Sequence, residues 1–92
     1  MSPLDNSTLL EKILVNGLIT PYFQPIYDLK NGKVYGHEAL SRGPKNSALF
    51  TPDPLFALAQ QEGKLHKLEL LCREKALSKF AKLSLEGRLF LN

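Results

Sequence analysis

The amino-acid sequence predicts an α/β fold in which a helix, a β-hairpin, two helices and a final strand follow one another. Two observations support this order. Apolar residues recur at helical spacing in three segments, two other runs are β-branched and aromatic, and the final run is mostly Leu and Phe. Because helices separate the hairpin from the final run at 88–92, we expect a parallel βαβ connection with the helices on one side of the sheet.

The predicted first helix covers 7–16. We expect Asn6 or Ser7 to be its N-cap, and Gly17 follows where a left-handed C-cap belongs. Its apolar residues form one stripe along the helix, which predicts that this side is buried. They are Leu10, Ile13 and Leu14.

Two further helices are predicted in the second half of the chain. The shorter begins with Asp53 as N-cap and Pro54 in the first helical position, and Gly63 ends it. The longer helix carries an apolar stripe, in which we expect Cys72 to be a buried small hydrophobic side chain. The residues of this stripe are Leu65, Leu68, Cys72, Ala76, Phe80 and Leu83.

The hairpin is predicted from two strand-like runs, 22–29 and 33–40, on either side of a turn. Pro25 lies inside the first run and has no backbone N–H to donate. The first strand is therefore expected at the edge of the sheet, or with this position turned away from its partner.

The length of the turn decides which side chains of the hairpin share a face. If Asn31-Gly32 is a two-residue turn, Gln24 lies opposite Ala39. If Lys30-Asn31-Gly32 forms a type I turn closed by a left-handed glycine, Leu29 pairs with Lys33 and Gln24 lies opposite Glu38. Only the second register places the two polar residues on one face, and the hairpin residues leave both registers open.

Charge and composition exclude several classes of protein. The net charge is +3, and the excess of Lys and Arg lies in 64–88, which we interpret as the solvated face of the longer helix. A small basic module that binds nucleic acid is the less favoured alternative, so we expect no DNA or RNA partner. The single cysteine excludes an internal disulfide, and no apolar run is long enough to span a membrane. We expect a cytoplasmic protein.

The segment 36–43 holds the densest cluster of chemically capable residues. His37-Glu38 resembles the start of the zinc-protease motif H-E-x-x-H, but Ser41 stands where the second histidine belongs. Glu38 could give an oxygen ligand to Mg²⁺, and the planar donors of Arg42 could hold a phosphate. Taken alone, each of these charged residues is more often an ordinary surface side chain.

Four motifs occur in a fixed order along the chain. They are FQPI at 23–26, EALSR at 38–42, the helix LHKLELLCREKAL, and LFLN at 89–92. Together, from about residue 10 to Asn92, they resemble the opening of an EAL domain, a family of bacterial cyclic di-GMP phosphodiesterases. The family fold is a modified TIM barrel whose first strand is antiparallel to the rest. With roughly 250 residues in a typical barrel, the resemblance implies that 1–92 is the N-terminal part of a single EAL domain, with the remainder absent.

The resemblance implies roles for five residues. Glu38 and Asn92 match positions that bind the divalent metal, Mg²⁺ or Mn²⁺, in the intact domain. Gln24, Leu40 and Arg42 match positions that contact the dinucleotide, with Arg42 on phosphate. No catalytic residue beyond the metal ligands is implied here. The resemblance also favours the register that places Gln24 opposite Glu38.

The reaction implied by the resemblance is hydrolysis of one phosphodiester bond of cyclic di-GMP to linear pGpG, in bacterial second-messenger signalling. The later metal-binding residues of the family lie beyond Asn92, so we expect this chain alone to be inactive. The alternative is a degenerate EAL domain that serves as a non-catalytic cyclic di-GMP receptor or protein-interaction module. A homodimer formed through the domain is a further expectation, and His37 is expected to face away from the pocket.

Overall fold

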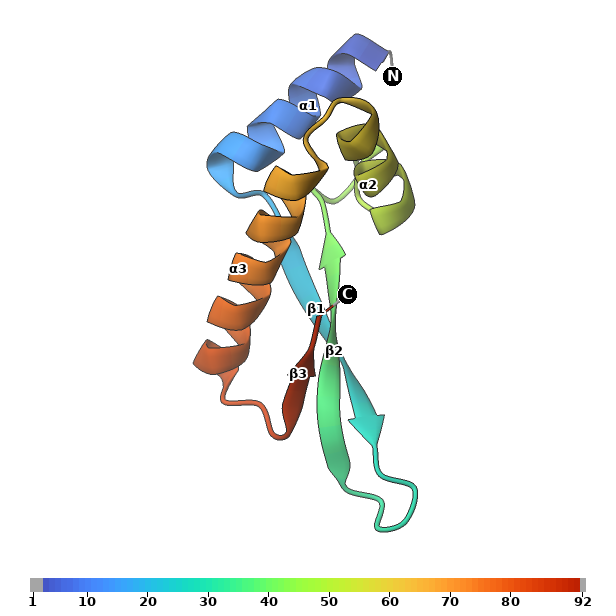
Figure 1. Cartoon of the computed structure of the whole chain (residues 1–92), viewed down its shortest axis with the longest axis vertical. Coiled ribbons are helices and arrows are strands. Elements are labelled where there is room, and N and C mark those ends of the chain that lie inside the picture. The colour runs from blue at the N-terminus through green and yellow to red at the C-terminus, as the bar shows by residue number, and fades with distance from the viewer. Residues whose placement is uncertain (1–2, 92) are drawn as a thin grey trace.

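We describe the protein from a computed structural model that covers residues 3–91, with side chains from residue 6 onward (Figure 1). The elements follow the predicted order of helix, hairpin, two helices and strand, which confirms a mixed α/β fold. They are α1 (Pro3–Asn16), β1 (Thr20–Tyr27), β2 (Val34–Arg42), α2 (Pro52–Gln61), α3 (Leu65–Leu83) and β3 (Arg88–Phe90).

The first helix begins earlier than its sequence pattern predicts. It starts at Pro3, and proline fits the first helical turn because no intrahelical partner is needed for its missing N–H. Asn6 and Ser7 therefore lie inside the helix, and the prediction that one of them is the N-cap is wrong. The hydroxyl of Ser7 instead donates a hydrogen bond to the carboxylate of Glu62 at the end of α2.

The shorter helix also begins earlier, and the longer one begins where it was predicted. Thr51 is the N-cap of α2 and Pro52 its first residue, so the prediction of Asp53 as N-cap is wrong by two positions. Both prolines of the segment fit in the first helical turn. The bounds of α3 agree with the apolar stripe, and Ser84 ends that helix in the left-handed conformation.

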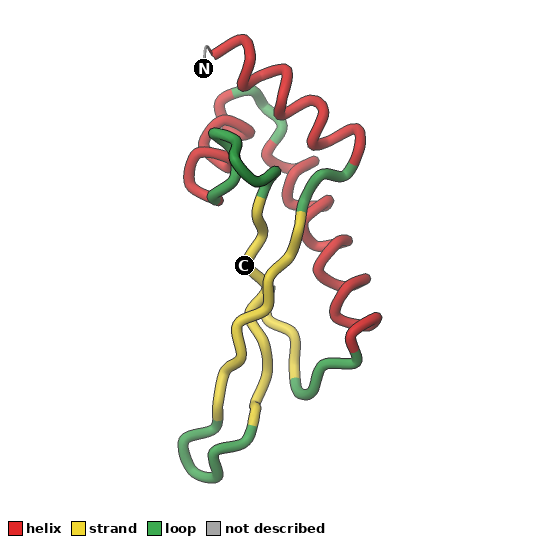
Figure 2. Tube along the Cα trace, turned by 180° about the vertical axis from the view of Figure 1, so that it is seen from behind, coloured by secondary structure: helices red, strands yellow, loops and turns green. Residues whose placement is uncertain are grey.

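The three strands form one sheet in the order β1-β2-β3 (Figure 2). β1 pairs antiparallel with β2, and β3 pairs parallel with β2 on its other side. The helical crossover therefore returns the chain to a parallel strand, as predicted. β1 is an edge strand, which is where its internal Pro25 is tolerated.

The hairpin has the register in which Gln24 lies opposite Glu38, although the turn is neither of the two that the sequence left open. The backbone N–H of Asp28 donates to the carbonyl of Lys33 at 2.8 Å, so the predicted pairing of Leu29 with Lys33 is wrong. A bulge between Tyr27 and Ile26 then shifts the pairing by one residue. This shift brings Gln24 opposite Glu38.

The bulge lies on β2. Ile26 is opposite Gly36 and Tyr27 is opposite Val34, which leaves Tyr35 as the additional residue of β2. An additional residue twists the strand locally and changes which face the next side chains occupy. From Gly36 onward, the two strands pair without interruption as far as Arg42.

The buried core lies among the helices at one end of the sheet. α1, α2 and the start of α3 meet at this end, while the turn of the hairpin extends in the opposite direction (Figure 1). The residues of the buried core come from all three helices, from Ile19 before β1 and from Leu49 in the loop after β2. They are Leu10, Ile13, Ile19, Leu49, Leu55, Ala59 and Leu68. None of the helices in the described part of the chain is long and apolar enough to cross a membrane.

The second half of α3 packs against one face of the sheet. The ring of Phe80 meets that of Phe23 edge-on with centroids 5.8 Å apart, and meets that of His37 at 6.0 Å. His37 is 9% exposed, so this face of the sheet is closed by the helix. No helix among residues 3–91 lies along the opposite face (Figure 2), although α2 and α3 form a groove beside Leu40 and Arg42 at one end of it.

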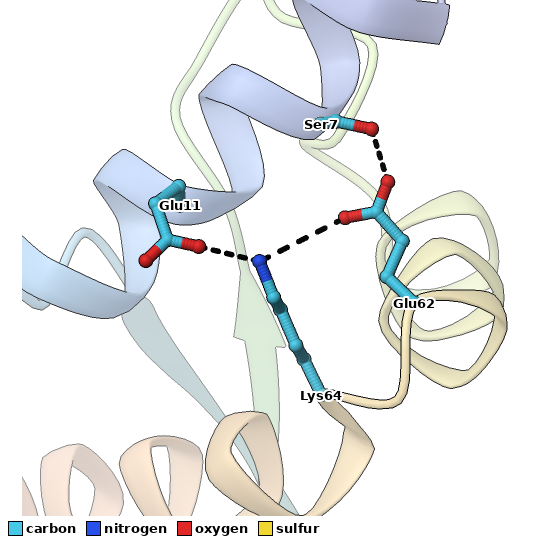
Figure 3. A network of polar contacts seen from close by, with 4 residues as sticks. All are labelled: Ser7, Glu11, Glu62 and Lys64. Carbon is cyan, nitrogen blue, oxygen red and sulfur yellow. Dashed lines mark hydrogen bonds and ion pairs between the residues drawn. The ribbon is translucent and has the colours of Figure 1, made fainter.

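A small polar network joins α1 to the turn between α2 and α3 (Figure 3). The ammonium group of Lys64 lies 2.5 Å from a carboxylate oxygen of Glu11 and 4.0 Å from one of Glu62. Glu62 also accepts the hydrogen bond from Ser7. The hydrogen bond from Lys64, with its positive charge as the next cause, lowers the pKa of Glu11 below its ordinary value of 4.5.

We expect this network to make folding stability sensitive to acid. A carboxylate with a lowered pKa stabilises the fold fully above its ordinary pKa, and this contribution disappears as the pH falls below that value. Replacing Glu11→Gln should therefore flatten the decline of the unfolding midpoint below about pH 4.5 while lowering it slightly at pH 7. Thermal unfolding across this pH range measures the effect. The exposed Glu74→Gln is the control, and equal curves for Glu11→Gln and the unchanged protein would contradict the expectation.

Candidate functional site

Side chains of β1 and β2 divide between two faces of the sheet. Phe23 and His37 point toward α3, where both rings contact Phe80. Because successive residues of a strand point to opposite faces, their neighbours Gln24 and Glu38 lie on the face away from α3.

Three successive cross-strand pairs line the face away from α3. Directly opposed residues of antiparallel strands share a face, so each pair presents two side chains together. From the bulge toward the helical core, the pairs are Gln24 with Glu38, Tyr22 with Leu40, and Thr20 with Arg42. Four of the five residues that the sequence indicates are thus brought to one face. The fifth, Asn92, lies outside the described residues.

The charged members of these pairs are only partly open to solvent. Glu38 and Arg42 are half-buried, whereas Gln24 is exposed. The guanidinium of Arg42 donates a hydrogen bond from Nη1 to the carbonyl oxygen of Ser41 at 3.0 Å. This bond uses one of its five donors, which leaves the outer edge of the group suited to an anion.

The donors beside Glu38 suit a hard divalent cation. A carboxylate and an amide that share one sheet face offer oxygen atoms, which Mg²⁺ and Mn²⁺ prefer to nitrogen and sulfur. Within residues 3–91, no cluster of three or more His, Cys, Asp or Glu side chains could enclose a metal. The described residues therefore fit part of an oxygen-donor set and do not form a complete site.

A groove of about 330 Å³ borders the carboxyl end of β2. β3 pairs with β2 only as far as Glu38, opposite Phe90, so the remaining residues of β2 have an open edge on this side. The other walls come from α2, α3 and Leu91. Leu40 and Arg42 line the groove, whereas Gln24 and Glu38 do not. Arg73 and Glu69 give the groove charges of both signs.

Cys72 lies in the wall of this groove and is half-buried. Burial raises the pKa of its thiol, and a hydrogen bond with Ser41 opposes that shift to a lesser extent. A thiol with a raised pKa stays protonated at neutral pH, and the protonated form is a poor nucleophile. The cysteine is therefore a packing residue here, in agreement with its place on the apolar stripe.

The loop after β2 holds the end of that strand in place. Gly43 follows Arg42, and its N–H donates to the carbonyl of Phe50 at 2.9 Å. This bond folds the loop back so that Leu49 enters the core. Only a glycine fits, because a Cβ atom at position 43 would collide with the carbonyl group of Leu49.

Sequence reasoning missed two residues of this face. Tyr22 and Thr20 occupy the same face as Gln24, and neither belongs to the motifs that were singled out. The two-residue period of a strand is the signal that finds them, once Gln24 is known to lie on this face.

The comparison with protein families decides the family of the chain. The family model described as the EAL domain matches residues 7–92. The chain belongs to the EAL domain family. The match covers the three cross-strand pairs and the groove, and it confirms the family that the ordered motifs indicate.

One curated protein is similar in sequence to this EAL domain. Over 63 residues, the chain is 41% identical to "Probable cyclic di-GMP phosphodiesterase PdeB" of Escherichia coli (strain K12). The aligned part is 67% of this chain and 12% of the relative. The EAL chain therefore spans about an eighth of the length of that protein.

Two solved structures share the fold. They are the Vibrio cholerae LapD S helix-GGDEF-EAL, bound to c-di-GMP and apo. Each has a TM-score of 0.77 at 21% sequence identity and covers 100% of this chain, which corresponds to 22% of the LapD chain. At this level of identity the likeness concerns the fold, and the three helices and three strands of this EAL chain correspond to one part of a larger structure.

We expect Gly43→Ala to destabilise this EAL domain by about 1–3 kcal/mol, the usual cost of forcing a group into filled space. The backbone at Leu49 would have to move, which would pull its side chain from the core and shift Arg42. Urea unfolding measures the loss. Asn46→Gly in the same loop is the control, because Asn46 has φ +62° and glycine adopts this conformation freely. A Gly43→Ala midpoint equal to that of the control would contradict the expected collision.

Proposed function

We propose that the EAL domain to which this chain contributes hydrolyses cyclic di-GMP to pGpG with the help of divalent metal ions. The observation that carries the proposal is the alignment of Gln24, Glu38, Leu40 and Arg42 on one uncovered sheet face. These are the residues that match the metal and dinucleotide positions of the family. The name of the Escherichia coli relative, a probable cyclic di-GMP phosphodiesterase, supports the same substrate.

The proposed domain is larger than the chain described here. We propose that residues 1–92 form the N-terminal part of one barrel and that further strands supply the remaining metal ligands. The limited coverage of the relatives, 12% and 22% of their lengths, supports this division. So does the incomplete donor set, since Glu38 has no cluster of acidic side chains around it in the described residues.

Each residue of the face has a distinct proposed role. The guanidinium of Arg42 is planar and carries parallel donors, so it holds and orients a phosphate of the dinucleotide. Glu38 supplies a carboxylate oxygen to the metal, Asn92 an amide oxygen, and Gln24 lies beside them to contact the ligand. Leu40 packs against an apolar part of the nucleotide. A bound divalent ion would lower the pKa of a water molecule and neutralise charge on the phosphate.

The proposal also includes the metal ion, the cellular location and the association of two copies. Phosphodiesterases of the EAL family use divalent metals, and cyclic di-GMP is the ligand named for both LapD and PdeB. We propose Mg²⁺ or Mn²⁺ for this domain, a cytoplasmic location and association of two copies through the domain. A receptor that binds cyclic di-GMP without cleaving it is the alternative, and the experiments below separate it from the enzyme.

We expect the 92-residue chain alone to show no hydrolysis of cyclic di-GMP, because the described residues hold only part of the oxygen-donor set. The measurement is chromatographic detection of pGpG after incubation with Mg²⁺ or Mn²⁺. The complete protein in which the chain occurs is the positive control. Circular dichroism of the isolated chain establishes that it is folded in the assay. Formation of pGpG by the isolated, folded chain would contradict the proposed division of the site.

In the complete protein, Glu38→Ala should lower the rate of pGpG formation by about 100-fold or more. Even residues that only orient metal ligands cost 10–100-fold when replaced, so a direct ligand should cost at least the upper value. Arg42→Ala should instead raise KM by about tenfold or more, because a charge-assisted hydrogen bond to phosphate is lost.

The matched control for both variants is Glu74→Ala, on the exposed side of α3, which should keep the unmodified rate. Unchanged turnover in Glu38→Ala would exclude Glu38 from the metal site. Binding of cyclic di-GMP by the unmodified complete protein, without any pGpG in the presence of either metal, would favour the receptor over the enzyme.

A further inference from the structure

The middle pair of the uncovered face contains a residue to which the proposed function has given no role. Tyr22 lies opposite Leu40, between the pair that holds Glu38 and the pair that holds Arg42. Residues two apart on a strand are separated by about 7 Å, so the tyrosine lies one step from the proposed metal ligand and one step from the proposed phosphate contact.

The ring of Tyr22 points away from α3 and is accessible. Its neighbours Pro21 and Phe23 face the helix, where Pro21 is buried and Phe23 contacts Phe80. Alternation along the strand therefore places Tyr22 on the opposite face, where it is 40% exposed. Its ring makes no aromatic contact with another residue in the described part of the chain.

The other two tyrosines of the chain are differently placed. Tyr27 lies opposite Val34, beside the turn of the hairpin and at the far end of β1 from Arg42. Tyr35 is occupied, since its ring stacks on Phe90 with centroids 5.9 Å apart and Arg88 lies over it. Tyr22 is thus the tyrosine at the end of the sheet where the proposed ligand contacts gather.

The three pairs combine polar and apolar side chains, as a nucleotide combines a charged phosphate with a flat apolar base. The outer pairs offer a carboxylate and a guanidinium, which suit a metal ion and a phosphate. The middle pair offers an aromatic ring and a branched aliphatic side chain, which suit the flat apolar surface of a base. Aromatic rings stack on nucleic-acid bases and contribute substantially to affinity.

We infer that Tyr22 is a specificity-determining residue whose ring packs, together with Leu40, against a purine base of the cyclic dinucleotide. This inference rests on the proposed function and adds a residue to it. Leu40 alone offers an aliphatic surface of limited extent, so the tyrosine supplies the flat surface that distinguishes a base from a simple phosphodiester.

The test measures equilibrium binding of cyclic di-GMP to the complete protein, in EDTA so that the ligand stays intact. Tyr22→Leu keeps an apolar side chain of moderate size and removes the aromatic ring, and Tyr22→Phe keeps the ring and removes the hydroxyl. We expect Tyr22→Leu to weaken binding by about tenfold and Tyr22→Phe to bind within about threefold of the unmodified protein. Tyr27→Leu, on the same strand beyond the site, is the control and should bind normally.

Thermal unfolding of all four proteins verifies that differences in binding do not arise from loss of the fold. If Tyr22→Leu is folded and binds cyclic di-GMP as tightly as the control, the inference is overturned. The proposed ligand is not affected by that result. Tyr22→Phe that binds as weakly as Tyr22→Leu also overturns it, because the hydroxyl would then make the contact rather than the ring. If the unmodified protein does not bind cyclic di-GMP, the proposed function fails and this inference fails with it.

Discussion

The pairing register of β1 and β2 is the constraint on which the candidate site depends. With Gln24 opposite Glu38, the polar residues of both strands face away from α3, and Phe23 and His37 face toward it. A slip of β1 by one residue would exchange its two faces, burying Gln24 beside Phe80 and exposing Phe23. The contacts of Phe80 with both strands therefore stabilise the register as well as the fold. The bulge at Tyr35 is equally necessary for this register. Without it, the pairing that begins at the turn would place Gln24 opposite His37 instead of Glu38.

The residues of the buried core and the residues of the candidate site lie in different parts of this chain. The fully buried side chains lie among the three helices and in the loop at Leu49, while the polar face of the sheet contributes no residue to that cluster. Substitutions on this face should therefore disturb the buried cluster less than substitutions within it. Gly36 shows how closely β3 approaches at the other end of the sheet, since a Cβ atom there would lie 2.5 Å from the carbonyl oxygen of Arg88.

The sequence predicted the order of the elements, the bounds of α3 and the family, because each depends on a strong local pattern or on several motifs together. It did not predict the start of α2 at Pro52, since Thr51 and Asp53 are both good N-caps and tertiary packing of Leu49 and Leu55 decides between them. The bulge at Tyr35 has no local signature. The ring of Tyr35 stacks on Phe90, a residue distant in sequence, so the surroundings of the bulge include contacts that local reasoning does not reach. The place of Asn92 is a prediction still, because it lies outside the described residues.

The direction of β1 explains why the candidate site draws on opposite ends of two strands. In parallel α/β sheets, ligands bind at the carboxyl ends of the strands, so residues late in each strand carry the chemistry. The candidate residues of β2 fit this rule, with Glu38 at the middle of the strand and Leu40 and Arg42 toward its carboxyl end. β1 runs the other way, so its residues at the same end of the sheet are its earliest ones, from Thr20 to Gln24. An antiparallel first strand thus lets a short hairpin bring residues of two strands to the same end of the sheet. A parallel first strand would need its own helical crossover to do the same.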